Sequence, residues 1–261
     1  MLKLRVITSI VSLVGIGVVL FVIPPRYAEL FIGLLLIAGA WEWSGFLDLP
    51  NSPLRGLYTA IVSACLAAVY FVVPEMTGTI LLVSAAWWFA AFLWTLIYPT
   101  RIPLPVRWIC GLLVLVPLYA ALVLLFRLGV DYLLFTLFIV WAADAGAYFA
   151  GKKFGRVKLA PAISPGKTWE GVIGGLVLVA ALAVGVGMWR DLNIGVFLPF
   201  CLAVGALSVV GDLTVSMFKR TAGVKDSGSL FPGHGGVLDR IDSVAAAAPL
   251  FALGLGWLGL I

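Results

Sequence analysis

Apolar stretches long enough to cross a membrane recur along almost the whole chain. A transmembrane helix needs about 20 predominantly apolar residues, and 63% of the residues here are hydrophobic while only 11% are charged. Soluble domains carry about 25% charged residues. Continuous runs of this length also exclude a membrane β-barrel, because barrel strands alternate between apolar and polar residues. The sequence therefore predicts an all-α, polytopic integral membrane protein.

The basic residues orient these stretches. We expect about nine transmembrane helices, near residues 6–23, 27–47, 56–74, 78–98, 104–126, 131–151, 169–189, 193–218 and 240–260. If the N-terminus is cytoplasmic, only three of the 17 Lys and Arg residues fall outside, namely Arg26, Arg127 and Arg190. Cytoplasmic loops are enriched in Lys and Arg, so this distribution favours that orientation. The same bias accounts for the net charge of +5, and no nucleic-acid partner is expected.

The polar residues divide the chain into two unequal parts. Residues 1–100 form N-terminal transmembrane helices with few charges. Their candidate intramembrane carboxylate is Glu42, between two tryptophans, a setting more typical of a membrane interface than of a site. Residues 101–261 are expected to form a catalytic transmembrane region with cytoplasmic loops at 152–168 and 219–239.

Charge is concentrated between Asp212 and Asp242. These 31 positions contain eight charged residues and the single histidine of the chain. A charge at the bilayer centre costs about 2.5–3.5 kcal/mol on insertion scales, so intramembrane charges are retained mainly where they have a function. Carboxylates, fixed cations and glycines gathered at one membrane face indicate a metal–phosphate site.

The predicted eighth helix carries a polar stripe. Ser216 follows Asp212 by four residues and Lys219 follows by seven, so the three side chains share one helix face. The same stripe is also compatible with an ion pair that only holds helices together.

Four aspartates are candidate metal ligands. Mg²⁺ is usually bound by one or two carboxylates together with substrate phosphates. Asp212 and Asp239, from facing helices, would provide that pair, and Asp144 and Asp242 are further candidates. Asp242 could equally be a helix N-terminal charge favoured by the helix dipole.

The segment between the last two predicted helices combines glycines with basic residues. Glycine lets backbone N–H groups approach an anion closely, and Arg and Lys bind phosphates. Lys225 and His234 are expected to act in catalysis with Asp212 and Asp239, although His234 could instead order the loop. The predicted phosphate-binding residues are Ser164, Lys167, Ser216, Lys219, Arg220, Gly235, Gly236 and Arg240.

The other loop contains the run SPGKTWEG, whose GKT suggests a nucleotide-binding P-loop. That motif requires a glycine five residues before Gly166, and Pro161 stands there. The P-loop interpretation therefore fails, while Lys167 and Ser164 can still reach a phosphate.

The run SMFKRTAGVKDSGSLFPGHGGVLDRID resembles the signature of phosphatidate cytidylyltransferases, also called CDP-diacylglycerol synthases. WAADAGAYFAG and SPGKTWEG resemble further segments of that family, except that Gly166 stands where Lys or Asn is typical. Residues 1–100 resemble the family only in being hydrophobic. The resemblance therefore rests on the C-terminal part.

The resemblance implies an enzyme that condenses CTP with phosphatidic acid, using Mg²⁺, to give CDP-diacylglycerol and pyrophosphate. It implies a homodimer in the cell inner (cytoplasmic) membrane, with the site open to the cytoplasm and to lipid. It also implies that Asp212 and Asp239 bind the metal.

Two other functions remain open. A CTP-dependent kinase acting on a lipid alcohol, such as polyprenol or phytol, would need a similar site but would release CDP. In a transporter, intramembrane carboxylates would line a pathway. The gathering of charge at one face disfavours transport.

Overall fold

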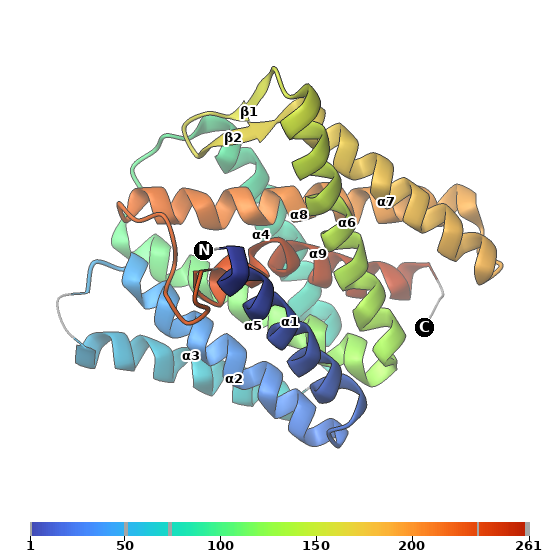
Figure 1. Cartoon of the computed structure of the whole chain (residues 1–261). Helices are drawn as coiled ribbons and strands as arrows, with labels where there is room; N and C mark the ends of the chain where they lie inside the picture. The colour runs from blue at the N-terminus through green and yellow to red at the C-terminus, as the bar shows by residue number, and fades with distance from the viewer. Residues whose placement is uncertain (1, 50–51, 73–74, 234, 259–261) are drawn as a thin grey trace.

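In the computed structural model the described residues are 2–49, 52–72, 75–233 and 235–258. Over these ranges the chain forms nine long helices, a short 3₁₀ helix and a two-stranded sheet (Figure 1). The helices are α1 (Leu2–Phe21), α2 (Pro25–Trp43), α3 (Ser52–Val72), α4 (Thr77–Ile97), α5 (Leu104–Leu128), α6 (Val130–Phe154), α7 (Trp169–Trp189), α8 (Ile194–Thr221) and α9 (Leu238–Trp257). The 3₁₀ helix η1 spans Ser44–Phe46, and the strands are β1 (Lys158–Ala160) and β2 (Ser164–Thr168).

Seven of the described helices are long and apolar enough to cross a membrane. These spans are Pro25–Phe46, Pro53–Phe71, Thr77–Ile97, Leu104–Leu128, Val130–Phe154, Trp169–Trp189 and Ile194–Thr221. They confirm the prediction of an α-helical, multi-pass membrane protein. Helices α1 and α9 lie outside this group, and α9 begins with the charged residues Asp239, Arg240 and Asp242.

Helix α5 lies at the centre of the packing. It contacts α2, α3, α4, α6 and α9, and Leu115, Leu118 and Leu125 on it are completely buried. Helix α9 contributes a run of four buried alanines, 245–248. Such small side chains let neighbouring helix backbones approach closely. The buried middle of the bundle thus holds α8 and α9 in a fixed relation to each other.

Two close helix contacts position the polar residues. At Gly146 on α6, an added Cβ would lie 2.5 Å from the carbonyl oxygen of Gly174 on α7. At Gly211 on α8, it would lie 2.4 Å from the carbonyl oxygen of Asp242 on α9. Glycine at both positions therefore lets the backbones touch, which brings Asp144 beside α7 and Asp212 beside the start of α9.

The segments that follow α2, α6 and α8 make polar contacts at one end of the bundle. Arg107 at the start of α5 pairs with Asp48, which follows α2. Arg220 at the end of α8 donates to the carbonyl oxygen of Ile163 in the β1–β2 turn, 3.1 Å away. The segment between α8 and α9 passes beside α1, where Thr8 Oγ1 donates to the carbonyl oxygen of Pro232 (Figure 1).

Two other ion pairs link the opposite ends of these helices. Arg127 at the end of α5 pairs with Glu29 at the start of α2. Arg190, just after α7, pairs with Asp131 at the start of α6. Arg127 and Arg190, two of the three basic residues expected outside the cytoplasm, thus lie at the end of the bundle opposite the polar connecting segments.

The expected loop at 152–168 is more ordered than its composition suggested. Helix α6 continues through Phe154, and β1 then pairs antiparallel with β2, Ala160 opposite Ser164. Ile163 in the turn is buried, and the Trp169 amide donates to the carbonyl oxygen of Val157. The second expected loop, 219–239, likewise begins as helix, because α8 continues to Thr221.

Candidate active site

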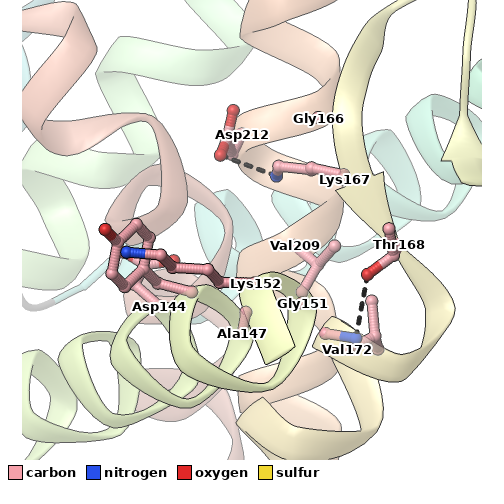
Figure 2. A pocket seen from close by; sticks show the side chains of 12 residues that line it. Asp144, Ala147, Gly151, Lys152, Gly166, Lys167, Thr168, Val172, Val209 and Asp212 are labelled. Atoms are coloured by element: carbon pink, nitrogen blue, oxygen red, sulfur yellow. Dashed lines mark hydrogen bonds and ion pairs between the residues drawn. The ribbon is translucent and has the colours of Figure 1, made fainter. Parts of the chain in front are cut away.

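A polar pocket of about 380 Å³ lies between α6, α7, α8 and strand β2. Asp144 and Tyr148 line it from α6, Lys167 from β2 and Asp212 from α8. Figure 2 shows Lys167 pointing toward Asp212, and the Nζ of Lys167 lies 2.6 Å from the Oδ2 of Asp212. Each side chain is 26% exposed, so the pair remains accessible from the pocket.

The stripe predicted on the eighth helix is present on α8. Ser216 Oγ donates to Asp212 Oδ1 at 3.0 Å, four residues away. Lys219 also acts electrostatically on Asp212, but its ammonium pairs with Asp239 instead, at 2.8 Å. Asp212 therefore pairs α8 with strand β2 through Lys167 and is also a carboxylate that faces the pocket.

Asp239 is fully hydrogen-bonded. Its Oδ1 accepts from Lys219 Nζ, and its Oδ2 accepts from the amides of Ser227 and Gly236, each at 2.9 Å. The Ser227 hydroxyl lies 3.0 Å from the same Oδ2 and shares its single proton between Asp239 and Glu42. Asp212 and Asp239 thus lie on adjacent helices with Lys219 interacting with both, yet their closest partners differ. In this structure Asp239 organises the segment between α8 and α9.

Asp144 and Asp242 lie within electrostatic range of Asp212. Asp144 interacts with Asp212, Lys167 and Arg240. Asp242 interacts with Asp212 and Lys219, and its Oδ1 accepts from the Ser243 amide at 2.8 Å. Of the four candidate aspartates, Asp144 and Asp212 are the two that line the pocket.

The predicted phosphate-binding residues fall into two groups. Lys167 lines the pocket, and Arg240, which is exposed and is not a lining residue, interacts electrostatically with Asp144. Ser164 and Arg220, by contrast, make structural contacts: Ser164 pairs within the β1–β2 sheet, and Arg220 donates to the β1–β2 turn. Lys225 is exposed on the segment after α8. His234 lies outside the described residues.

The glycine-rich segment already encloses an anion, the carboxylate of Glu42 from α2. Glu42 accepts hydrogen bonds from the amides of Val237 and Leu238 and from the hydroxyl of Ser227, each at 2.9 Å. A Cβ added at Gly236 would lie 2.3 Å from this carboxylate. The amide of Gly236 itself binds Asp239, while Gly235 takes a φ of 82° that favours glycine.

The contacts of Glu42 with the segment between α8 and α9 were not predicted from the sequence. The available signal was a carboxylate inside a long apolar helix, and its flanking tryptophans favoured an interface position. The structure shows Glu42 only 7% exposed, in contact with the segment that joins α8 to α9.

The carboxylates of the pocket offer oxygen ligands of the kind that Mg²⁺ prefers. Among the described residues, three or more His, Cys, Asp or Glu side chains nowhere converge on one point. Mg²⁺ usually keeps waters and takes one or two carboxylates plus substrate phosphates. Asp144 and Asp212, which face the same pocket, fit a Mg²⁺ ion whose remaining ligands are phosphate oxygens and waters.

Comparisons with known proteins cover nearly the full chain. The family model described as "Cytidylyltransferase family" matches residues 3–257. A phosphatidate cytidylyltransferase of Pseudomonas aeruginosa is 43% identical over 270 residues, covering 98% of this chain and 99% of that protein. One from Haemophilus influenzae is 40% identical over 283 residues, covering 97% and 98%. One from Staphylococcus aureus is 47% identical over 124 residues, covering 47% and 48%.

Proposed function

This chain belongs to the cytidylyltransferase family, and we propose that it transfers the CMP moiety of CTP to phosphatidic acid. The products are CDP-diacylglycerol, a precursor for phospholipid synthesis, and pyrophosphate. The observation that carries the proposal is the similarity, over nearly the whole chain, to two phosphatidate cytidylyltransferases. The pocket with Asp212 and Lys167 supports it, because it provides both signs of charge at the end of membrane helices.

An apolar cavity beside the polar pocket supports a lipid substrate. This cavity, of about 750 Å³, lies between α4, α7 and α8, and it shares Val172 and Val209 with the polar pocket. Phosphatidic acid has a phosphate and two acyl chains, so it needs a polar and an apolar compartment next to each other. In our proposal the phosphate of phosphatidic acid lies at the polar pocket, and an acyl chain enters the apolar cavity.

The reaction requires alignment and charge stabilisation more than a strong base. An oxygen of the lipid phosphate attacks the α-phosphorus of CTP, and the bond to the bridging oxygen of the β-phosphate breaks, releasing pyrophosphate. The attacking phosphate is already ionised, so no proton has to be removed from it. Lys167 and Arg240 would hold phosphate oxygens and orient the two anions for in-line attack.

Mg²⁺ fits this scheme as an ion bound by the carboxylates that line the pocket. Asp144 and Asp212 would hold it, with Asp242 beside them and Asp239 fixing Lys219. A bound Mg²⁺ would neutralise phosphate charge and stabilise the leaving pyrophosphate. The protein residues would then fix the positions of the two substrates.

We also propose how the chain lies in the membrane. It crosses the inner membrane nine times, with its N-terminus in the cytoplasm and its active site facing the cytoplasm. The grouping of polar connecting segments at one end supports it, as does the placing of Arg127 and Arg190 at the other. A homodimer is a further part of the proposal and is tested by the mass of the purified protein in detergent or nanodiscs.

The function is tested with purified protein, CTP, phosphatidic acid and Mg²⁺. CTP labelled at the α-phosphate should give a labelled lipid, and pyrophosphate should be released in equal amount. Release of CDP with a lipid alcohol as acceptor would identify a kinase instead. Uptake of solute into vesicles without nucleotide transfer would identify a transporter.

A further inference from the structure

Glu42 is a buried carboxylate whose partners among the described residues lie in the segment before α9 or in its first turn. It stands at the end of α2 and is 7% exposed. Within the described ranges, its hydrogen-bond donors are the amides of Val237 and Leu238 and the hydroxyl of Ser227. The ion pairs identified among those residues do not include Glu42. Its charge is therefore stabilised by hydrogen bonds from this segment.

The first two contacts cap α9 from another helix. The first N–H groups of a helix lack partners within the helix, and the N-cap residue Val237 provides no side-chain acceptor. Glu42 fills that role from 195 residues earlier in the chain. A carboxylate at a helix N-terminus is also favoured by the helix dipole. The start of α9, which carries Asp239, Arg240 and Asp242, is thus held by α2.

The third contact leads to the ion pair of the site. Ser227 Oγ lies 2.9 Å from Glu42 Oε2 and 3.0 Å from Asp239 Oδ2. Asp239 in turn pairs with Lys219, and Lys219 interacts with Asp212. A continuous series of polar contacts therefore joins Glu42 to the carboxylate that faces the pocket.

The glycines of this segment fit closely around Glu42. A Cβ added at Gly228 would lie 2.5 Å from Glu42 Oε1, and one added at Gly236 would lie 2.3 Å away. Both values are far below an ordinary van der Waals contact. These glycines thus let the segment wrap closely around a carboxylate of the protein itself.

We propose that Glu42 is a positioning residue for nucleotide transfer. It orients the segment between α8 and α9 so that Lys219, Asp239 and Arg240 stand in fixed places at the site. The catalytic part of this inference rests on the proposed function, whereas the structural part, the anchoring of the segment, does not.

The test compares Glu42→Gln with Glu29→Gln. Glu29 is a second buried carboxylate on α2, but it pairs with Arg127 at the opposite end of the bundle. Glutamine keeps the size of the side chain and loses the charge and one acceptor. Hydrogen–deuterium exchange of peptides covering 225–240 is measured in both variants, together with kcat and KM for CTP per folded protein.

In the Glu42 variant we expect faster exchange at the amides of Ser227, Val237 and Leu238, and a kcat/KM for CTP at least tenfold lower. In the Glu29 variant we expect exchange in 225–240 and KM to match the wild type. Unchanged exchange and unchanged kcat/KM in the Glu42 variant would overturn the inference, and so would equal changes in both variants. Faster exchange with unchanged kcat/KM would show an anchor without a role in transfer, and would also overturn it.

Ser227→Ala keeps the inference testable if the Glu42 variant does not fold. It removes only the hydroxyl between Glu42 and Asp239, so we expect a smaller change in KM for CTP in the same direction. A normal KM in this variant would argue against the series of contacts. If the wild type forms no CDP-diacylglycerol but exchange still responds to Glu42→Gln, the proposed function fails while the anchoring by Glu42 stands.

Discussion

Lys167 and Asp212 come from different elements and meet at 2.6 Å across the polar pocket. Lys167 belongs to β2, in the connection between α6 and α7, and Asp212 lies on α8. The pair therefore joins a polar hairpin to a membrane helix at the place where we put the substrate phosphates. An ammonium and a carboxylate so placed can bind an anion and a cation side by side.

Replacing Asp212 by asparagine is expected to abolish nucleotide transfer, with a loss of at least about 100-fold in kcat/KM, the effect of removing one strong electrostatic contact to a transition state. Insertion and folding should be largely retained, because asparagine keeps the shape and can still accept from Ser216. Formation of labelled CDP-diacylglycerol and the yield of folded protein are measured together. Asp131→Asn, which breaks the pair with Arg190 at the opposite end, is the control. Normal turnover by the Asp212 variant would remove this residue from the mechanism.

Replacing Lys167 by methionine is expected to raise the KM for CTP about tenfold, since charge-assisted hydrogen bonds contribute about 1.5–3 kcal/mol. Methionine retains most of the apolar length of the side chain but cannot bind phosphate. The matched control is Lys158→Met, at an exposed position on the paired strand β1. Equal KM values for both variants would show that the charge of Lys167 does not contact the nucleotide.

The bundle could be predicted largely because hydrophobicity alone determines membrane helices. The expected span at 169–189 coincides with α7. The expected span at 104–126 begins with α5 and ends two residues before the end of that helix. Helix α8 runs past its expected end at 218 because Lys219 stays helical and pairs with Asp239. A window of hydropathy does not detect that pairing, because the partner lies 20 residues farther along the chain.

The site was predictable in its residue types and less so in its contacts. The spacing of Asp212 and Ser216 predicted that they share one helix face, and the structure adds a hydrogen bond between them. The pairing of Glu42 with Val237 could not be derived in this way, because no periodicity relates residues 195 positions apart. The strands β1 and β2 are too short for alternation to be visible, so 152–168 was expected to be a loop. The metal roles of the aspartates stay predictions.

Filling the apolar cavity is expected to impair the lipid substrate selectively. Ala206 on α8 lines this cavity and is exposed, so a phenylalanine there should narrow the cavity without disturbing the core. We expect a KM for long-chain phosphatidic acid raised several-fold, with the KM for CTP unchanged. The control is Val196→Phe, at an exposed position in the first turn of α8. If dioctanoyl and dioleoyl substrates are affected equally in the Ala206 variant, the acyl chains lie elsewhere.

The contact of α8 with α9 at Gly211 is expected to tolerate no side chain. An alanine there would place its Cβ 2.4 Å from the carbonyl oxygen of Asp242 and 3.0 Å from the Cβ of Ala246. Because the nearest atom belongs to the backbone, the helices must separate, and overpacking of this kind typically costs about 1–3 kcal/mol. Gly211→Ala should therefore lower the midpoint of thermal unfolding in detergent and reduce transfer activity, since Asp212 would shift relative to Asp242. The control is Gly185→Ala on α7, where an added Cβ meets no atom within 4 Å. A Gly211 variant as stable and active as the Gly185 variant would mean that α8 and α9 do not pack as closely as described.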